Sequence, residues 1–116
     1  MCGIIGIASN KPVSSTIINS LKKLEYRGYD SAGIVLYDGK ELKLSKTKGK
    51  VSDLEAKAEK EQTLFGTVGM GHTRWSTHGV PNDVNSHPHF SNSGKLVKVF
   101  FCARTRTKQN PFQWFV

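Results

Sequence analysis

An abrupt change in composition at Lys98 divides this sequence of 116 residues into two unequal parts. The last 19 residues hold five of the eleven aromatic residues and four of the basic ones, but no glycine and no acidic residue. Residues 1–97 hold all eleven glycines, with 13 basic and 9 acidic residues. We therefore expect residues 1–97 to build the folded part of the chain, and that length suits a single domain.

The composition of the whole chain excludes several classes of protein. Charged residues make up 22% and hydrophobic residues 37%, which is typical of neither disordered nor fibrous chains. No apolar run approaches the roughly 18 residues of a membrane-spanning helix. The start, MCGIIGIASN, lacks the basic leader of a secretory signal. Two cysteines cannot make a disulfide scaffold, so we expect a cytoplasmic protein with no membrane partner.

Apolar spacing predicts an α+β arrangement. Helices are expected over residues 14–24, capped by Ser14 or Ser15, and from Ser52 to about Glu61, where Ser52 and Glu55 would form a capping box. A tight hairpin turn is expected at Asp38-Gly39, because glycine accepts a positive φ. The long loop from Arg74 to Ser93 is of the kind that often carries function. The expected strands are 3–8, 32–37, 41–45, 67–73 and 95–101.

Cys2 is the first candidate for a catalytic residue. Removal of Met1 would give one residue both a thiol nucleophile and a free α-amine. The ordinary pKa of an α-amine, about 7.7–8.0, lies close to working pH. A base held covalently beside its nucleophile avoids much of the entropy cost of bringing the two together. The alternative interpretation is an inert, buried cysteine.

The segment from His72 to His89 is the second candidate. It contains one arginine, one tryptophan and all four histidines of the chain. An arginine binds a carboxylate through two parallel hydrogen bonds, threonine hydroxyls hold an amide or amine, and Trp75 could cover an aliphatic stem. These residue types favour an amino-acid-like substrate. A polar surface loop is the simpler alternative.

A metal site is a further alternative for the same segment. His87 and His89, with His78 or Cys2, would supply the ligands. Their spacing matches none of the common zinc patterns, and Cys102 stands alone. We therefore expect no metal.

Three segments resemble one enzyme family. They read MCGIIGI from Met1, LEYRGYDSAG from Leu24 and GHTRWSTHG from Gly71, and HPH at 87–89 extends the match. The first segment alone is similar to any glutamine amidotransferase with an N-terminal nucleophile, including asparagine synthetase and amidophosphoribosyltransferase. The other two resemble the glutaminase domain of glutamine–fructose-6-phosphate aminotransferases. The resemblance covers residues 1–97.

The resemblance implies a fold and a reaction. The fold is the αββα four-layer sandwich of N-terminal-nucleophile hydrolases, here incomplete. Cys2 would attack the side-chain amide of L-glutamine, releasing ammonia and forming a γ-glutamyl thioester that water hydrolyses. In the family, ammonia passes to a sugar-phosphate isomerase domain, absent from this sequence, where fructose 6-phosphate becomes glucosamine 6-phosphate. No cofactor is implied, and the full-length family enzyme is expected to be a homo-oligomer.

The resemblance also implies roles for individual residues. Arg74 matches the position that grips the α-carboxylate of the substrate. Other matching positions line the substrate pocket or support the nucleophile. The pocket positions are Trp75, Thr77 and His78. The supporting positions are Arg27 and Gly28 beside the terminus and His87 near the border with the sugar domain.

The resemblance ends in the last expected strand. There the family continues into His-Asn-Gly, whose Asn and Gly form the oxyanion hole, and losing one such donor costs about 10²–10³ in rate. No Asn-Gly pair follows Val99 here. A change of reading frame near codon 98 explains both this loss and the change in composition, and another frame would then encode His-Asn-Gly. Residues 98–116 are accordingly expected to be an aberrant tail.

Three alternatives concern the chain as a whole. The first is that the chain is an inactive remnant of the domain. The second is that its tail is a genuine divergence, and the third is that the tail is a basic nucleic-acid-binding arm. Arg104, Arg106 and Lys108 beside aromatic residues are the right types for such an arm. Four positive charges are weak evidence for it, so we expect no nucleic-acid partner. A sandwich lacking strands would expose sheet faces and edges, so we also expect a marginally stable or self-associating chain.

Overall fold

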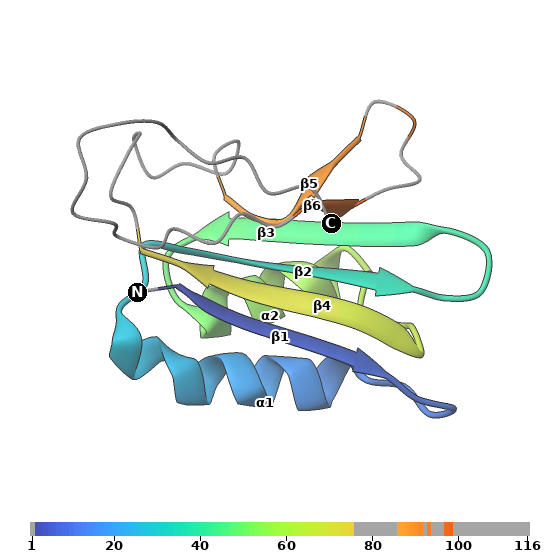
Figure 1. Cartoon of the computed structure of the whole chain (residues 1–116), viewed down its shortest axis with the longest axis horizontal. Coiled ribbons are helices and arrows are strands. Elements are labelled where there is room, and N and C mark those ends of the chain that lie inside the picture. Colours follow the sequence, from blue (N-terminus) through green and yellow to red (C-terminus); the bar gives the residue numbers. More distant parts are fainter. Residues whose placement is uncertain (1, 76–85, 92, 94–96, 99–116) are drawn as a thin grey trace, which may run out of the picture.

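A four-stranded antiparallel sheet forms the centre of the molecule (Figure 1). The computed structural model describes residues 2–75, 86–91, 93 and 97–98. The strands lie in the order β1-β4-β2-β3, so that the N-terminal strand occupies one edge of the sheet. Their bounds are β1 (Gly3–Ala8), β2 (Ser31–Tyr37), β3 (Leu42–Lys48) and β4 (Val68–Arg74).

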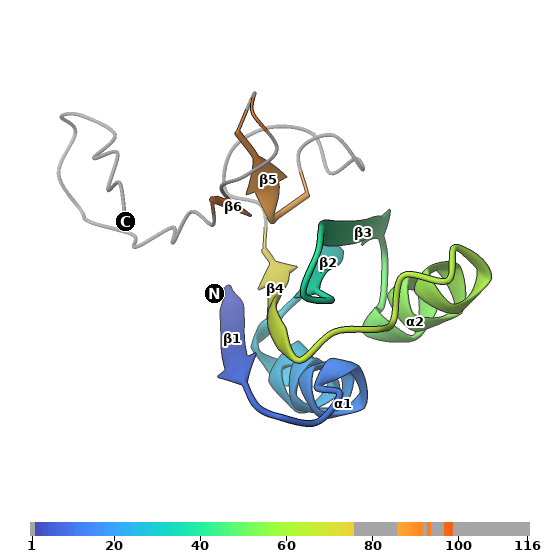
Figure 2. The ribbon, with the colours of Figure 1, turned by 90° about the vertical axis from the view of Figure 1, so that its right-hand side faces the viewer.

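Two helices cover one face of this sheet (Figure 2). Helix α1 (Ser14–Leu24) packs on β1 and β4, and α2 (Val51–Lys60) packs on β2 and β3. A single 3-10 turn, η1 (Glu25–Arg27), follows α1. A second, two-stranded sheet of β5 (His89–Phe90) and β6 (Val97–Lys98) lies on the opposite side. The described residues therefore show an α+β arrangement with a helical layer, a full sheet and part of a second sheet.

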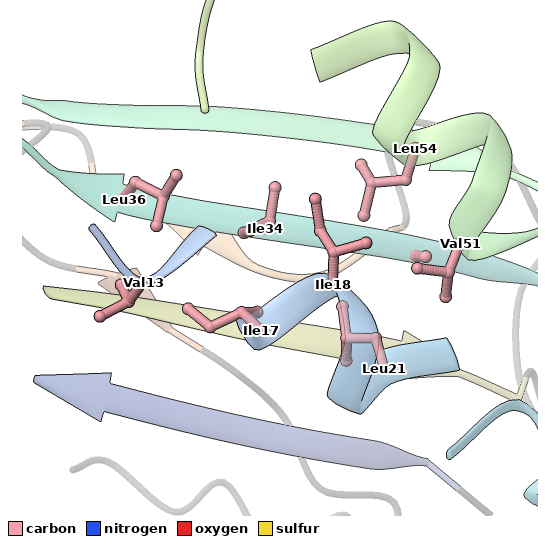
Figure 3. Close-up of a cluster of buried hydrophobic side chains, with 9 residues drawn as sticks. Val13, Ile17, Ile18, Leu21, Ile34, Leu36, Val51 and Leu54 are labelled. Carbon is pink, nitrogen blue, oxygen red and sulfur yellow. The ribbon is translucent and has the colours of Figure 1, made fainter. Parts of the chain in front are cut away.

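The hydrophobic core lies between the helices and the sheet (Figure 3). Ile17 and Leu21 of α1 are fully buried against β4. Glycines make this close packing possible, because a Cβ at Gly71 would lie 2.6 Å from Ile17 Cγ2 and one at Gly69 would lie 2.8 Å from Ile17 Cδ1. The remaining members of the cluster are Val13, Ile18, Ala32, Ile34, Leu36, Val51 and Leu54.

Most expected elements are confirmed. The strand over 3–8 and the helix over 14–24 have the expected bounds, and β4 is displaced by one residue from 67–73. The hairpin is also confirmed, with Gly39 at φ +96° in a turn that runs from Asp38 to Glu41. Its second strand, β3, is longer than expected. Of the last expected strand, only Val97 and Lys98 lie within the described residues.

The expected helix caps are wrong. Helix α1 starts after Val13 without a side-chain cap, although Ser14 and Ser15 follow. Helix α2 starts one residue before Ser52, and its first amide, that of Val51, donates to the carboxylate of Glu25 at 2.6 Å. A side chain 26 positions away thus binds this amide, while a local cap forms two residues before the expected one, where the Lys50 amide donates to the Asp53 carboxylate at 2.9 Å.

Candidate functional site

Cys2 lies buried at the edge of the main sheet, directly before β1. Its exposed fraction is 5%. The next amide, that of Gly3, donates to the Thr73 hydroxyl at 3.2 Å, which ties the start of the chain to β4. A Cβ at Gly3 would lie 2.7 Å from that hydroxyl and 2.9 Å from Leu24 Cβ. Glycine therefore lets the N-terminal strand approach both β4 and α1 closely.

The register of the sheet brings Cys2 and Arg74 together. Gly3 lies opposite Thr73 and Ile4 opposite His72, so one further step places Cys2 opposite Arg74. Successive side chains of a strand point to opposite faces. Thr73 is on the face toward α1, as the Gly3 contacts show, so Cys2, His72 and Arg74 share the other face. This is the face on which β5 and β6 lie (Figure 2).

The side chain of Trp75, which directly follows β4, packs on the loop after α1. Gly28 has φ +104°, a conformation that side chains rarely adopt. A Cβ there would also lie 2.5 Å from Trp75 Cε3. The indole ring therefore lies against the Gly28 backbone, although its exposed fraction is 49%. The Arg27–Gly28 segment, which closes η1, thus lies beside the strand that carries Arg74.

Three histidines gather beside Arg74 on the same face. His72 is fully buried, and its Nε2 lies 3.4 Å from His87 Nδ1. The ring centroids of His72 and His87 are 4.6 Å apart, and those of His87 and His89 are 4.8 Å apart. Gly33 of β2 makes room for this cluster, since a Cβ there would overlap the carbonyl oxygen of His87.

The sequence predicted a supporting role for His87. It did not predict that His72 contacts His87 or that Gly33 leaves room for it. The strand expected over 67–73 contains the signal that would have found them. Its period of two places His72 on the face of Arg74, and Gly33 lies opposite His72 in the neighbouring strand.

The residues of the metal alternative are described only in part, since His78 lies outside the described ranges. Within the described ranges, no group of three His, Cys, Asp or Glu side chains is arranged to hold a metal ion. The rings of His72 and His87, and those of His87 and His89, lie in contact. Thr77 and His78 lie outside the described residues, as does the tail from Val99. Among the helices of the described part, none is long and apolar enough to span a membrane.

Acidification should destabilise the fold through His89. Its pKa is held below the ordinary 6.5 by burial and by the positive charges of Lys46 and Arg74. The unfolded chain therefore binds more protons than the folded chain as pH falls below about 6.5. This contribution to stability is complete above that pH and is lost toward the lower, folded pKa. We expect the urea midpoint to fall from pH 7.5 to pH 5 less in His89→Gln than in the unsubstituted chain. Equal falls in the two proteins would show that His89 does not contribute.

Known proteins similar to this chain fall into one enzyme group, although no family model matches it. A glutamine–fructose-6-phosphate aminotransferase [isomerizing] of Mesorhizobium japonicum is 52% identical over 97 residues, which is 84% of this chain. The proteins of the same name from Bacteroides thetaiotaomicron and Clostridium acetobutylicum are 51% and 48% identical over 100 and 99 residues. In each case the chain spans 16% of the relative's length.

Solved structures agree on the fold. Glutamine phosphoribosylpyrophosphate amidotransferase from B. subtilis superposes with a TM-score of 0.65 at 24% identity, over 80% of this chain and 20% of that one. The allosteric regulatory enzyme of purine biosynthesis gives 0.68 at 25% identity, over 82% and 20%. The chain is therefore homologous to the N-terminal part of glutamine–fructose-6-phosphate aminotransferases and has the fold, incomplete here, of the N-terminal-nucleophile glutamine amidotransferases.

Proposed function

We propose that residues 1–97 are the nucleophile-bearing part of a glutamine amidotransferase domain. The Cys2 thiolate attacks the side-chain amide carbon of L-glutamine, and the amide nitrogen gains a proton and leaves as ammonia. Water then hydrolyses the γ-glutamyl thioester to glutamate and restores the thiol. The observation that carries this proposal is the placement of the buried Cys2 opposite Arg74 at one end of the sheet.

The neighbours of Cys2 suit an amino-acid substrate. In this proposal Arg74 binds the α-carboxylate of glutamine through paired, charge-assisted hydrogen bonds. Trp75, held against Gly28, covers the aliphatic part of the substrate. The pocket roles of Thr77 and His78, and the supporting roles of Arg27 and His87, rest on the resemblance. The α-amine freed by removal of Met1 serves as the base, so the intact mass should lack one methionine.

The ammonia has an acceptor in the relatives. Their printed name specifies an isomerizing aminotransferase that acts on fructose 6-phosphate. We propose that a sugar-phosphate isomerase domain uses the ammonia to make glucosamine 6-phosphate, in a cytoplasmic homo-oligomer. Residues 98–116 stand outside this scheme, because their composition differs from that of residues 1–97 and no Asn-Gly pair follows Val99.

A chimera tests the proposal without relying on the tail. Residues 1–97 replace the corresponding residues of the Mesorhizobium japonicum relative, and glutamate release from L-glutamine is measured against the parent enzyme. We expect the chimera to release glutamate within about tenfold of the parent rate, since the two are 52% identical over 97 residues and the chimera regains the oxyanion donors. A correctly folded chimera that releases no glutamate contradicts the proposal.

The second candidate is an inactive remnant of the same domain, favoured by the missing Asn-Gly pair. The rate of glutamate release by the chain of 116 residues itself distinguishes the two candidate functions. Because the loss of an oxyanion donor costs about 10²–10³ in rate, we expect the chain alone to be at least about 10²-fold slower than the chimera. Equal rates would show that the chain is competent without those donors.

A further inference from the structure

We propose that Thr73 is a positioning residue for the nucleophile, because its buried hydroxyl holds the residue that follows Cys2. The role depends on the proposed function, in which Cys2 is the first residue of the mature chain and supplies both the thiol and the base. Thr73 lies between His72 and Arg74 in β4, and the resemblance assigns it no role. Its side chain is on the face toward α1, so it acts through the backbone of β1 and does not touch the substrate.

The contact between Thr73 and Gly3 is direct and buried. The exposed fraction of Thr73 is 0%, and its hydroxyl accepts a hydrogen bond from the Gly3 amide at 3.2 Å. Leu24, the last residue of α1, also lies close to Gly3, since a Cβ there would come within 2.9 Å of Leu24 Cβ. Gly3 therefore packs tightly on Thr73 and on the end of α1. The first residues of a domain are well ordered only where such contacts tie them down.

Fixing the Gly3 amide also fixes part of Cys2. The peptide group between the two residues is planar, so the direction of the Gly3 N–H sets the plane in which the Cα of Cys2 lies. Only the rotations about the Cα–C and Cα–Cβ bonds of Cys2 then remain to place its α-amine and its thiol. One hydrogen bond at this point thereby limits the positions of both reacting groups.

β4 also carries the residue that holds the substrate in the proposed function. Arg74, which binds the α-carboxylate there, directly follows Thr73. The separation of the nucleophile from Arg74 determines where the side-chain amide of glutamine lies relative to the thiol. Loss of the Thr73 hydroxyl should displace the nucleophile and leave Arg74 in place. We therefore expect kcat to fall while the KM for glutamine changes little.

Substitutions of Thr73 in the chimera test this role. Thr73→Val keeps the branched shape but removes the acceptor, so kcat for glutamate release should fall by about 10- to 100-fold, since a misplacement of about 1 Å costs about 10²-fold. The KM for glutamine should change by less than about threefold, because Arg74 still binds the carboxylate. Thr73→Ser keeps the hydroxyl and should retain the kcat of the unsubstituted chimera. A merely structural role would not separate kcat from KM in this way.

Thr47→Val is the matched control. Thr47 of β3 lies in the same row across the sheet, opposite Ala32 of β2, which is itself opposite Thr73. The substitution is the same, and it also removes a hydroxyl that forms a hydrogen bond, to the Lys48 carbonyl at 3.3 Å. Because β2 and β4 separate β3 from β1, this variant should keep the kcat and KM of the unsubstituted chimera.

Amide hydrogen exchange in the full chain of 116 residues tests the positioning without an assay of activity. In Thr73→Val, the Gly3 amide should exchange about tenfold faster relative to the amide of Ile34 in the core, the factor expected for one lost hydrogen bond. Thr73→Ser and Thr47→Val should leave this ratio unchanged. A general loss of stability would instead speed the exchange of both amides equally.

The outcomes separate this role from the proposed function. Unchanged kcat in Thr73→Val, a Thr73→Ser variant as slow as Thr73→Val, or equally faster exchange at Gly3 and Ile34 would each overturn the role. If circular dichroism shows Thr73→Val unfolded, Gly3→Ala decides, because its Cβ would crowd the hydroxyl at 2.7 Å and kcat must then fall at constant KM. An inactive unsubstituted chimera would overturn the proposed function, and hydrogen exchange would still decide whether Thr73 holds the terminus.

Discussion

Replacing Cys2 with alanine should lower glutamate release by the chimera by at least about 10³-fold, because the thioester cannot form without the thiol. The fold should survive the change. Cys2 lies before β1, on the face away from the helices, and it is not a member of the core cluster. The measurement is glutamate release at saturating glutamine, with urea denaturation as the check on folding.

Two comparisons separate the role of the nucleophile from that of its surroundings. Cys2→Ser keeps the size and polarity of the side chain but replaces the thiol by a weaker nucleophile, so it should also be severely impaired. Arg74→Lys keeps the charge but loses the planar, two-point contact with a carboxylate, so it should raise the KM for glutamine more than it lowers kcat. Activity of Cys2→Ala close to that of the unsubstituted chimera would disprove the assignment of the nucleophile.

The apolar pattern of the sequence predicted the bounds of the first helix and the first strand correctly. The spacing of Ile17, Ile18 and Leu21 predicted α1 with its observed bounds, and the apolar run of β1 did the same. The expected caps were wrong because α1 starts without a side-chain cap, and α2 starts one residue early with the Lys50 amide bound to Asp53. The Val51 amide also donates to Glu25, a contact that depends on how the end of α1 lies beside α2 and that the local sequence cannot predict.

The extent of β3 was underestimated for a related reason. Its last residues, Lys46 to Lys48, are polar and give no apolar alternation. They are nevertheless in the strand, because each lies opposite a residue of β2 and the edge position tolerates lysine. Pairing with a neighbour, rather than the strand's own pattern, determines where β3 ends.

For the candidate site, the sequence indicated which residues take part but not how they are arranged. Residue types and the resemblance identified Cys2 and Arg74 from the sequence. Neither could predict that the two lie opposite each other, because that follows from the register between β1 and β4. The histidine cluster was missed for the same reason. His72 and His87 are 15 residues apart, and they meet only because Gly33 lets the second segment lie on the sheet.

Replacing Ile17 with alanine should cost about 2–5 kcal/mol of unfolding free energy, the usual range for deleting a buried aliphatic side chain. Ile17 is fully buried, and it fills the space above Gly69 and Gly71. Since glycines have no side chain that could move into the cavity, the cost should lie in the upper part of that range. A domain of this kind has only about 5–15 kcal/mol in total. Urea denaturation followed by circular dichroism should therefore show a much lower midpoint.

The fit between Ile17 and the glycines of β4 can be isolated by a double substitution. Thr16→Ala, at an exposed neighbouring position, should change stability by less than about 0.5 kcal/mol and serves as the control. Gly71→Ala should destabilise the unsubstituted chain, because its Cβ would lie 2.6 Å from Ile17 Cγ2. In the Ile17→Ala background that atom is gone, so the second change should cost less there. Additive costs would mean that the glycine does not serve to admit Ile17, whereas a coupling of about 0.5–3 kcal/mol is expected for residues in contact.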